Sequence, residues 1–243
     1  CMKACIFQKQ EPVNIPHIET RVLTETLGLP WGLEIYGFLT RWNPLHIERP
    51  HAKPYNGASS TAFCGRLLAA LRYAAKQDTS AVALVGGKVA FNNGIHLGVI
   101  EAADDPRAEA WANIQRIDDV GEFVFNLSHG SHLTRRQATI AVLSSSAGAG
   151  GAILSACFDV VLARPSINLN YHYGAMGLSG SELRSLVLPL RAGEQAAERL
   201  LTDCLPVSPT TAHRLGLVDA IGPDDPDGFD RWAGQVASEV AAA

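Results

Sequence analysis

A short apolar run, a glycine-rich turn and a second apolar run follow one another between residues 139 and 158. Residues 139–143 have the length and β-branched content of a buried strand. Residues 147–151 read Ala-Gly-Ala-Gly-Gly, and we expect residues 152–158 to form a helix. A strand, a turn and a helix in this order predict a parallel sheet covered by helices, because parallel strands need long crossover connections.

The alternation of strands and helices continues along the chain. Ser59 or Ser60 is expected to cap a helix that runs to about residue 76, and an apolar strand follows at residues 81–85. Further helices are expected at residues 104–125, 181–188, 194–201, 209–215 and 229–243, and further strands at 160–163, 167–169 and 217–221. The predicted fold class is therefore α/β.

Composition excludes several classes of protein. With 47% hydrophobic and 18% charged residues, the 243-residue chain has the make-up of a folded domain. A net charge of −4 argues against a nucleic-acid partner, and the apolar runs are far shorter than the roughly 20 residues that span a membrane. The five cysteines lack metal-site spacing, and their odd number favours reduced thiols in the cytoplasm. We expect residues 1–32 to form an N-terminal extension or edge strands, and residues 33–243 to form one domain.

Two strand-to-helix turns contain glycines that would expose backbone N–H groups. Residues 91–97 read Phe-Asn-Asn-Gly-Ile-His-Leu, in which Gly94 would free the following amide, that of Ile95. In the second turn, Gly150 precedes the expected helix, whose first N–H groups and dipole favour an anion. Taken alone, the first segment is explained by an ordinary strand-to-helix turn, and the second by close packing of a helix on a strand. Two such amides, 55 residues apart, are more specific, because together they would hold a thioester carbonyl oxygen.

These turns and the order of elements resemble the crotonase (enoyl-CoA hydratase/isomerase) superfamily. The resemblance is closest to the crotonase-like C-terminal domain of HoxX-type hydrogenase-maturation proteins, and His96, in place of the usual acidic residue, is a further mark of that branch. It extends over residues 33–222 and rests on residues 55–61, 93–97, 99–103, 147–151, 176–178 and 180–182. The resemblance implies a spiral of strand–strand–helix units with a shortened C-terminal helical region.

The resemblance also implies a set of site residues. The oxyanion-hole amides would be those of Ile95 and Gly150. Both catalytic glutamates of a typical hydratase are missing, since Ile153 and His172 stand at their positions. Hydration by two carboxylates is therefore not expected. The catalytic candidates are Ile95, Gly150, His172, Tyr173 and Glu182, and the substrate-binding candidates are Tyr55, Asn56, Gly94, His96, Gly151 and Ser179.

Several of these residues have an equally simple structural explanation. His172, between two tyrosines, suits a hydrogen-bonded structural histidine as well as a proton carrier. Glu182 follows Gly-Ser and would complement a helix dipole without taking part in catalysis. His96 is as well suited to orienting its loop as to reacting. The sequence leaves these alternatives open.

The implied substrate is an acyl-CoA or another pantetheine thioester, with coenzyme A as part of the substrate and no tightly bound cofactor or metal. By resemblance, the reaction would be formyl-CoA decarbonylation or a related lyase reaction. The alternatives are a hydratase, isomerase or hydrolase acting on a larger thioester of secondary metabolism, and a non-catalytic thioester-binding assembly subunit. HoxX-type proteins are longer, so we expect either a free-standing relative or an excised domain, with a separate formyl-transferring partner. A homo-oligomer is also possible.

Overall fold

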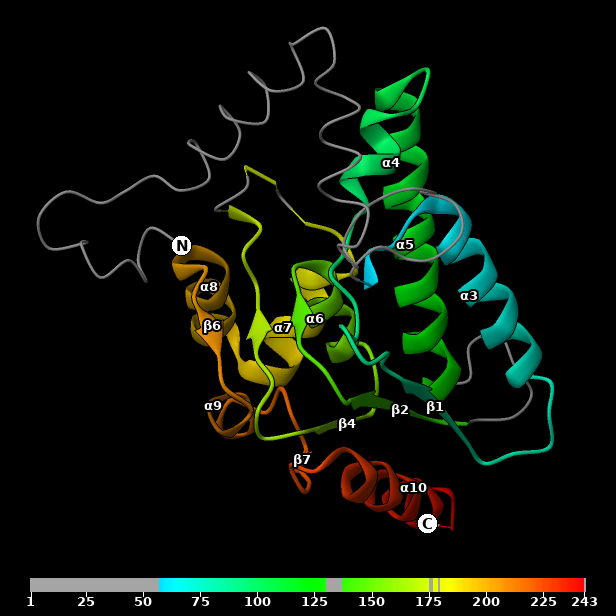
Figure 1. Ribbon diagram of the computed structural model, residues 1–243, viewed down its shortest axis with the longest axis vertical. Coiled ribbons are helices and arrows are strands. Elements are labelled where there is room, and N and C mark those ends of the chain that lie inside the picture. Colours follow the sequence, from blue (N-terminus) through cyan, green and yellow to red (C-terminus); the bar gives the residue numbers. More distant parts are fainter. Residues whose placement is uncertain (1–56, 130–136, 175–176, 179, 243) are drawn as a thin grey trace, which may run out of the picture. The chain divides into compact units, whose positions relative to one another are not determined.

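The computed structural model describes residues 57–129, 137–174, 177–178 and 180–242 (Figure 1). Its helices are α3 (Thr61–Ala74), α4 (Leu97–Glu101), α5 (Pro106–His129), α6 (Gly150–Ala156), α7 (Arg184–Ala192), α8 (Glu194–Asp203), α9 (Pro209–Arg214) and α10 (Pro226–Ala242). Its strands are β1 (Ala81–Val85), β2 (Ala138–Leu143), β3 (Ala147–Gly148), β4 (Val160–Ala163), β5 (Leu169–Asn170), β6 (Pro206–Val207) and β7 (Ala220–Ile221). None of these helices is both long and apolar enough to cross a membrane. The predicted domain boundary at residue 33 falls outside the described residues.

A parallel sheet with the order β1-β2-β4-β7 forms the centre of the fold. Alternate residues of β2 face opposite sides of the sheet: Ile140 and Val142 pack with Phe229 of α10, while Ala141 and Leu143 join the larger core. Figure 1 shows α10 on one side of this sheet and α3, α5, α6 and α7 on the other. Since helices cover both faces, the central strands β2 and β4 are apolar at every position except Thr139, as expected of a buried parallel sheet.

A second, smaller sheet carries the chain into the glycine-rich turn. Its order is β3-β5-β6, with β3 parallel and β6 antiparallel to β5. The turn continues from β3 through Ala149, which has a φ of 45° and is the N-terminal cap residue of α6. All seven residues of α6 are buried. The predicted order of strand, glycine-rich turn and helix is therefore confirmed, and the first turn of α6 lies inside the protein.

Two helices begin at serine caps, and the cap at Ser60 agrees with the expectation from the sequence. The Ser60 hydroxyl accepts a hydrogen bond of 3.2 Å from the N–H of Phe63 at the start of α3. The Ser208 hydroxyl accepts one of 3.2 Å from the N–H of Thr211 at the start of α9. Both side chains satisfy an N–H group that the helix itself leaves unpaired.

Other expectations about the elements were wrong in detail. The apolar run of β1 is only partly covered: Val85 is 60% exposed, and β1 is the end strand of the sheet that the described residues form. Helix α7 begins at Arg184 instead of residue 181, because Glu182 and Leu183 both have a φ of 56°, which an α-helix excludes. Helix α4, capped by His96, and the two-residue strands β3 and β6 were not predicted.

Candidate active site

Asn92 joins the loop after β1 to the glycine-rich turn. Its Nδ2 donates a hydrogen bond of 2.7 Å to Oγ of Ser59, and its Oδ1 accepts one of 2.6 Å from the N–H of Gly94. Its backbone carbonyl accepts one of 2.9 Å from the N–H of Gly148. The residue is 5% exposed. Asn92 thus fixes the two turns, which are far apart in sequence, against each other.

The two candidate oxyanion amides lie on these joined turns. The N–H of Ser59 donates to the Gly94 carbonyl and the N–H of His96 donates to the Ser59 carbonyl, so the pairing passes over the N–H of Ile95. Within the described part of the chain, neither the Ile95 nor the Gly150 N–H donates a hydrogen bond to another protein group. A β-carbon at Gly94, where φ is 74°, would lie 2.7 Å from the Gly150 nitrogen. The geometry therefore brings both turns to one place and leaves both donors available there.

The carboxyl group of Glu182 lies over the first turn of α6. Glu182 is 1% exposed. A β-carbon at Gly150 would lie 1.8 Å from Oε1 of Glu182 and 2.7 Å from the Tyr173 hydroxyl oxygen. Only glycine at position 150 leaves space for both groups. Three of the five catalytic candidates, Gly150, Tyr173 and Glu182, are therefore brought together.

Burial sets the acid–base properties of this group. The Tyr173 hydroxyl donates a short hydrogen bond to Oε2 of Glu182. Burial raises the pKa of Glu182 to about 7, although the hydrogen bond from Tyr173 opposes that change. Burial, together with the neighbouring Glu182 carboxylate, raises the pKa of Tyr173. Near neutral pH, Glu182 therefore exists in both its protonated and its ionised form, which suits a group that accepts and returns a proton.

The backbone of Glu182 has a conformation that non-glycine residues rarely adopt. Glu182 and Leu183 both have a φ of 56°, and such left-handed residues cost on the order of 1–3 kcal/mol each. The N–H of Glu182 donates a hydrogen bond of 2.7 Å to Oδ1 of Asp118 on α5, and its carbonyl accepts one of 3.5 Å from Sγ of Cys157. No local pattern in the sequence indicated Asp118, Cys157 or Asn92, because their roles depend on contacts between distant segments.

Two hollows meet at Asn92. A small internal cavity of about 10 Å³ lies beside the Glu182 carboxyl group, between α3, α5 and α6, and is lined by Ser59, Cys64, Leu67, Asn92, Ile117, Val120, Gly150, Leu154 and Glu182. A cleft of about 410 Å³ lies between α3 and the segment after β1, and Lys88 is among its lining residues. Asn92 and Leu67 line both hollows, so the cleft adjoins the cavity beside Glu182.

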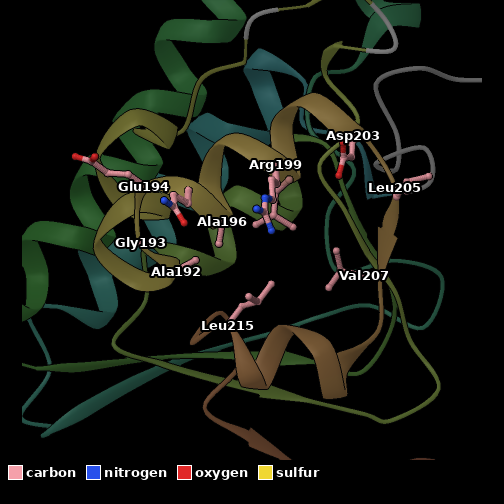
Figure 2. A pocket seen from close by; sticks show the side chains of 11 residues that line it. Ala192, Gly193, Glu194, Ala196, Arg199, Asp203, Leu205, Val207 and Leu215 are labelled. Carbon is pink, nitrogen blue, oxygen red and sulfur yellow. The ribbon is translucent and has the colours of Figure 1, made fainter.

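A larger pocket lies elsewhere in the fold. It measures about 670 Å³ and is bounded by α8, β6 and α9, with Arg199, Val207 and Leu215 among its lining residues (Figure 2). Among the candidate catalytic and substrate-binding residues that the structure describes, none lines it. Size alone therefore does not mark the candidate active site.

The remaining predicted residues fall into three groups. His172 lies beside Gly148, and its Nδ1 is 3.2 Å from the Asn170 carbonyl oxygen. His96 is buried and caps α4, its Nδ1 accepting a hydrogen bond of 3.2 Å from Val99, which supports the interpretation that it orients the loop. Tyr55, Asn56 and Ser179 lie outside the described residues.

Close packing accounts for Gly151, whereas its predicted substrate contact stays a prediction. A β-carbon there would lie 1.9 Å from the Asn92 carbonyl oxygen. Ile153, at the position of the first hydratase glutamate, is fully buried in the larger core. An isoleucine there has no proton to transfer.

Residues 45–242 match the family model described as "Enoyl-CoA hydratase/isomerase". The chain belongs to the enoyl-CoA hydratase/isomerase family. This crotonase domain contains both turns, Tyr173 and Glu182 within the matched range, so the resemblance found in the sequence and the predicted crotonase fold are confirmed.

Among its relatives, this crotonase domain is similar to HoxX and HypX. Over 168 residues it is 40% identical to the hydrogenase maturation factor HoxX of Bradyrhizobium diazoefficiens, an alignment covering 69% of this chain and 28% of HoxX. It superimposes on the crystal structure of a HypX variant from Aquifex aeolicus with a TM-score of 0.71 and 35% identity, covering 76% of this chain and 32% of HypX. The chain thus spans about a third or less of the length of these two relatives.

More distant structures agree on the fold alone. The Pseudomonas aeruginosa protein PA4980 superimposes with a TM-score of 0.67 at 23% identity, covering 81% of this chain and 79% of that protein. The HypX structure and the more distant structure therefore both support the crotonase fold. The similarity to HoxX and HypX indicates which branch of the family this chain resembles.

Proposed function

We propose that this domain binds formyl-coenzyme A and cleaves it to carbon monoxide and free coenzyme A, with Glu182 as the proton-transferring group. The observation that carries the proposal is the buried Glu182 carboxyl group, which accepts a hydrogen bond from Tyr173 and lies against Gly150. The chain lacks the two glutamates of a typical hydratase, so Glu182 is the carboxyl group that the described residues make available at this site. The similarity to HoxX and HypX supports the choice of a one-carbon acyl group.

The carbonyl oxygen of the thioester would lie between the amides of Ile95 and Gly150. Neither N–H group donates a hydrogen bond to another group among the described residues. Two donors fixed in advance there would orient and polarise the carbonyl group, which makes the formyl C–H more acidic. Asn92 and the positive φ of Gly94 keep the two turns in place, so the donors would need no rearrangement when the thioester binds.

Glu182 would move the proton. As a carboxylate it takes the proton from the formyl carbon, the C–S bond breaks, and its electron pair goes to sulfur. The carbon leaves as carbon monoxide, and Glu182 returns the proton to the thiolate, so the atoms of formyl-CoA are all accounted for in carbon monoxide and coenzyme A. A carboxyl group with a pKa of about 7 suits both transfers near neutral pH. Tyr173 would hold the carboxyl group and stabilise its ionised form.

Space near Glu182 favours a very small acyl group. The cavity beside its carboxyl group measures about 10 Å³, room for roughly one water-sized molecule. Glu182 and Tyr173 already occupy the space directly over Gly150. A formyl group fits this description better than the longer acyl chains of a typical hydratase substrate.

The coenzyme A portion would lie in the cleft that adjoins this cavity at Asn92. Most of the cleft is apolar, with Phe63, Leu67 and Leu84 in its wall, which suits a pantetheine arm. Lys88, among its lining residues, would supply a cation for the nucleotide phosphates. Coenzyme A would then be part of the substrate, with no further cofactor required.

A formyl-transferring partner would supply the substrate. One crystal structure of the similar protein HypX holds tetrahydrofolic acid, and this chain covers 32% of that protein. A folate-using formyl donor, on another part of a longer protein or on a separate one, would therefore precede this domain in the reaction sequence.

Incubation with formyl-CoA tests the proposal. We expect carbon monoxide, detected by the absorption spectrum of its complex with haemoglobin, and coenzyme A thiol in equal amounts. Glu182→Gln should lower the rate by about 100-fold or more, whereas Glu198→Gln, a change at an exposed glutamate of α8, should leave it unchanged. If the protein does not form carbon monoxide over many turnovers, the proposal is wrong. Turnover of longer thioesters would then favour a hydratase, isomerase or hydrolase, and binding without turnover would favour an assembly subunit.

A further inference from the structure

Asp118 lies on α5, far from Glu182 in sequence, yet its side chain meets the Glu182 backbone. Its Oδ1 accepts a hydrogen bond of 2.7 Å from the N–H of Glu182. Among the described residues, Asp118 forms no hydrogen bond with either of the turns that carry the candidate amides. Any effect of Asp118 on the site would therefore act through Glu182. We propose that Asp118 is the positioning residue that holds the Glu182 peptide in its left-handed conformation and thereby fixes the Glu182 carboxyl group against Tyr173 and Gly150.

The backbone at this point needs an external restraint. Glu182 and Leu183 are consecutive non-glycine residues with positive φ, a combination that side chains disfavour in both. Gly180, two residues earlier, also has a positive φ of 78°, but this conformation costs it little, since it lacks a β-carbon. Without a partner that stabilises this geometry, residues 182 and 183 would relax towards the right-handed conformation and lengthen α7 at its start.

The restraint acts on both sides of Glu182. Asp118 accepts from its N–H group, and Sγ of Cys157 donates to its carbonyl oxygen over 3.5 Å. The Asp118 bond is the stronger of the two, because an ionised acceptor forms hydrogen bonds about twice as strong as a neutral one and sulfur is a weak donor. Helix α5 comes close here: a β-carbon at Gly121, one turn beyond Asp118, would lie 3.7 Å from Cα of Glu182.

A change in the Glu182 backbone would displace its carboxyl group. The side chain begins at the residue that Asp118 restrains and ends at the Tyr173 hydroxyl and over Gly150. A misplacement of about 1 Å lowers a catalytic rate by about 100-fold. The catalytic part of this inference rests on the proposed function of Glu182, whereas the restraint of the backbone does not.

Three variants of α5 separate positioning from other effects. Asp118→Ala removes the acceptor and keeps a strong helix former, and Asp118→Asn keeps an acceptor oxygen without the charge. Asp119→Ala is the matched control, because Asp119 is the next residue on the same helix and pairs with Arg116 at the surface. If Asp118→Ala fails to fold, Asp118→Leu, which fills the vacated volume, takes its place.

Two measurements are needed. The first is the labelling rate of Cys157 by iodoacetamide, followed by peptide mass spectrometry on the full chain without substrate. Cys157 is 3% exposed, and we expect its labelling to be at least about 10-fold faster in Asp118→Ala, with wild-type rates in Asp118→Asn and Asp119→Ala. The second is the decarbonylation of formyl-CoA: Asp118→Ala should lower kcat by about 100-fold with little change in KM, and Asp118→Asn should restore most of it.

The outcomes are distinct. Equal Cys157 labelling in wild type and Asp118→Ala overturns the positioning role, whatever the activity. Faster labelling with no activity in the wild-type protein upholds the restraint and counts against the proposed function. A loss in Asp118→Ala that Asp118→Asn does not reverse would also overturn the inference, because hydrogen-bond acceptance would then not be what Asp118 supplies.

Discussion

The Tyr173 hydroxyl donates a hydrogen bond to a glutamate, Glu182, that is itself only 1% exposed. Burial makes both groups harder to ionise than they would be in water. The fold therefore keeps two weakly acidic groups in contact with each other at the start of α6. Each influences the other: the hydrogen bond favours the ionised carboxylate and lowers the pKa of Glu182, and the carboxylate raises the pKa of the Tyr173 phenol. The acid–base behaviour of the site therefore belongs to the pair.

We predict that Glu182 makes the stability of the protein dependent on pH in a specific direction. Its pKa of about 7 in the folded protein lies above its ordinary value of 4.5. Folding therefore favours the protonated form: the stabilisation is complete below about pH 4.5 and is lost as the pH rises through 7. The difference between the two pKa values corresponds to about 3 kcal/mol of unfolding free energy. Glutamine cannot ionise, so Glu182→Gln should gain about that amount relative to the wild type between pH 4.5 and pH 8.

Urea unfolding at both pH values measures this difference. Comparison of the two proteins removes the contributions of all other groups, provided that both unfold in two states. Glu198→Gln, at an exposed position, should follow the wild type at both pH values. A stability difference between wild type and Glu182→Gln that is the same at pH 4.5 and pH 8 would refute the prediction.

Tyr173→Phe should move the titration of Glu182 to higher pH. The hydrogen bond from Tyr173 lowers the pKa of Glu182, so its removal raises that pKa further above the ordinary value. The ¹³C chemical shift of the Glu182 carboxyl carbon, followed against pH, reports the change without any substrate. The matched control is Tyr73→Phe, because Tyr73 is 69% exposed on α3. An unchanged or lower midpoint in Tyr173→Phe would show that the phenol does not stabilise the carboxylate.

Local patterns in the sequence were enough to predict the central sheet and the two turns. Runs such as residues 139–143 and caps such as Ser60 depend on neighbours within a few positions, and the structure confirms both. The candidate amides of Ile95 and Gly150 were predicted because glycine-rich turns in this order resemble a known family. The sequence did not show that Asn92 joins the two turns through hydrogen bonds to both.

The surroundings of Glu182 were beyond local patterns. A helix was expected to start at residue 181, but Asp118 and Cys157, distant in sequence, stabilise a left-handed backbone at residues 182 and 183 instead. An aspartate within an amphipathic helix does not indicate such a partner. The sequence also does not show where a side chain lies in the folded protein, so it could not predict that the Tyr173 hydroxyl lies over Gly150.

Gly150 and Gly65 should respond in opposite ways to the same substitution. Both lie in helices, but a β-carbon at Gly150 would overlap Oε1 of Glu182 at 1.8 Å, whereas a β-carbon at Gly65 meets nothing within 4 Å. Gly65→Ala should stabilise the protein by about 0.5–1 kcal/mol through helix propensity. Gly150→Ala should destabilise it by about 2 kcal/mol or more, because the buried carboxyl group must move.

Urea unfolding of the two variants checks this pair, and the formyl-CoA assay adds a second readout. Gly65→Ala should keep wild-type activity, while Gly150→Ala should lose it. A Gly150→Ala protein as stable and active as Gly65→Ala would mean that the carboxyl group of Glu182 does not lie over α6.

Arg191 joins three segments of the fold, and we predict that lysine cannot replace it. From α7, its guanidinium donates to the backbone carbonyls of Ala156, Phe158, Asp159 and Gly216 and to the carboxylate of Asp219. The side chain is 14% exposed, and its bonds to the carbonyls of Ala156, Phe158 and Gly216 are partly buried, so these three acceptors would lose a partner without it. Arg191→Met should therefore cost about 3 kcal/mol or more of stability.

Arg191→Lys should recover little of that loss, because one ammonium group cannot reach acceptors on both sides of a planar fork. Arg116→Ala is the control: Arg116 is 47% exposed and pairs with Asp119 at the surface, which predicts a loss of about 0.5 kcal/mol or less. Thermal and urea unfolding of the three variants measures the ranking. An Arg191→Lys protein as stable as the wild type would mean that charge, and not the geometry of the guanidinium, joins α7 to the ends of α6 and α9.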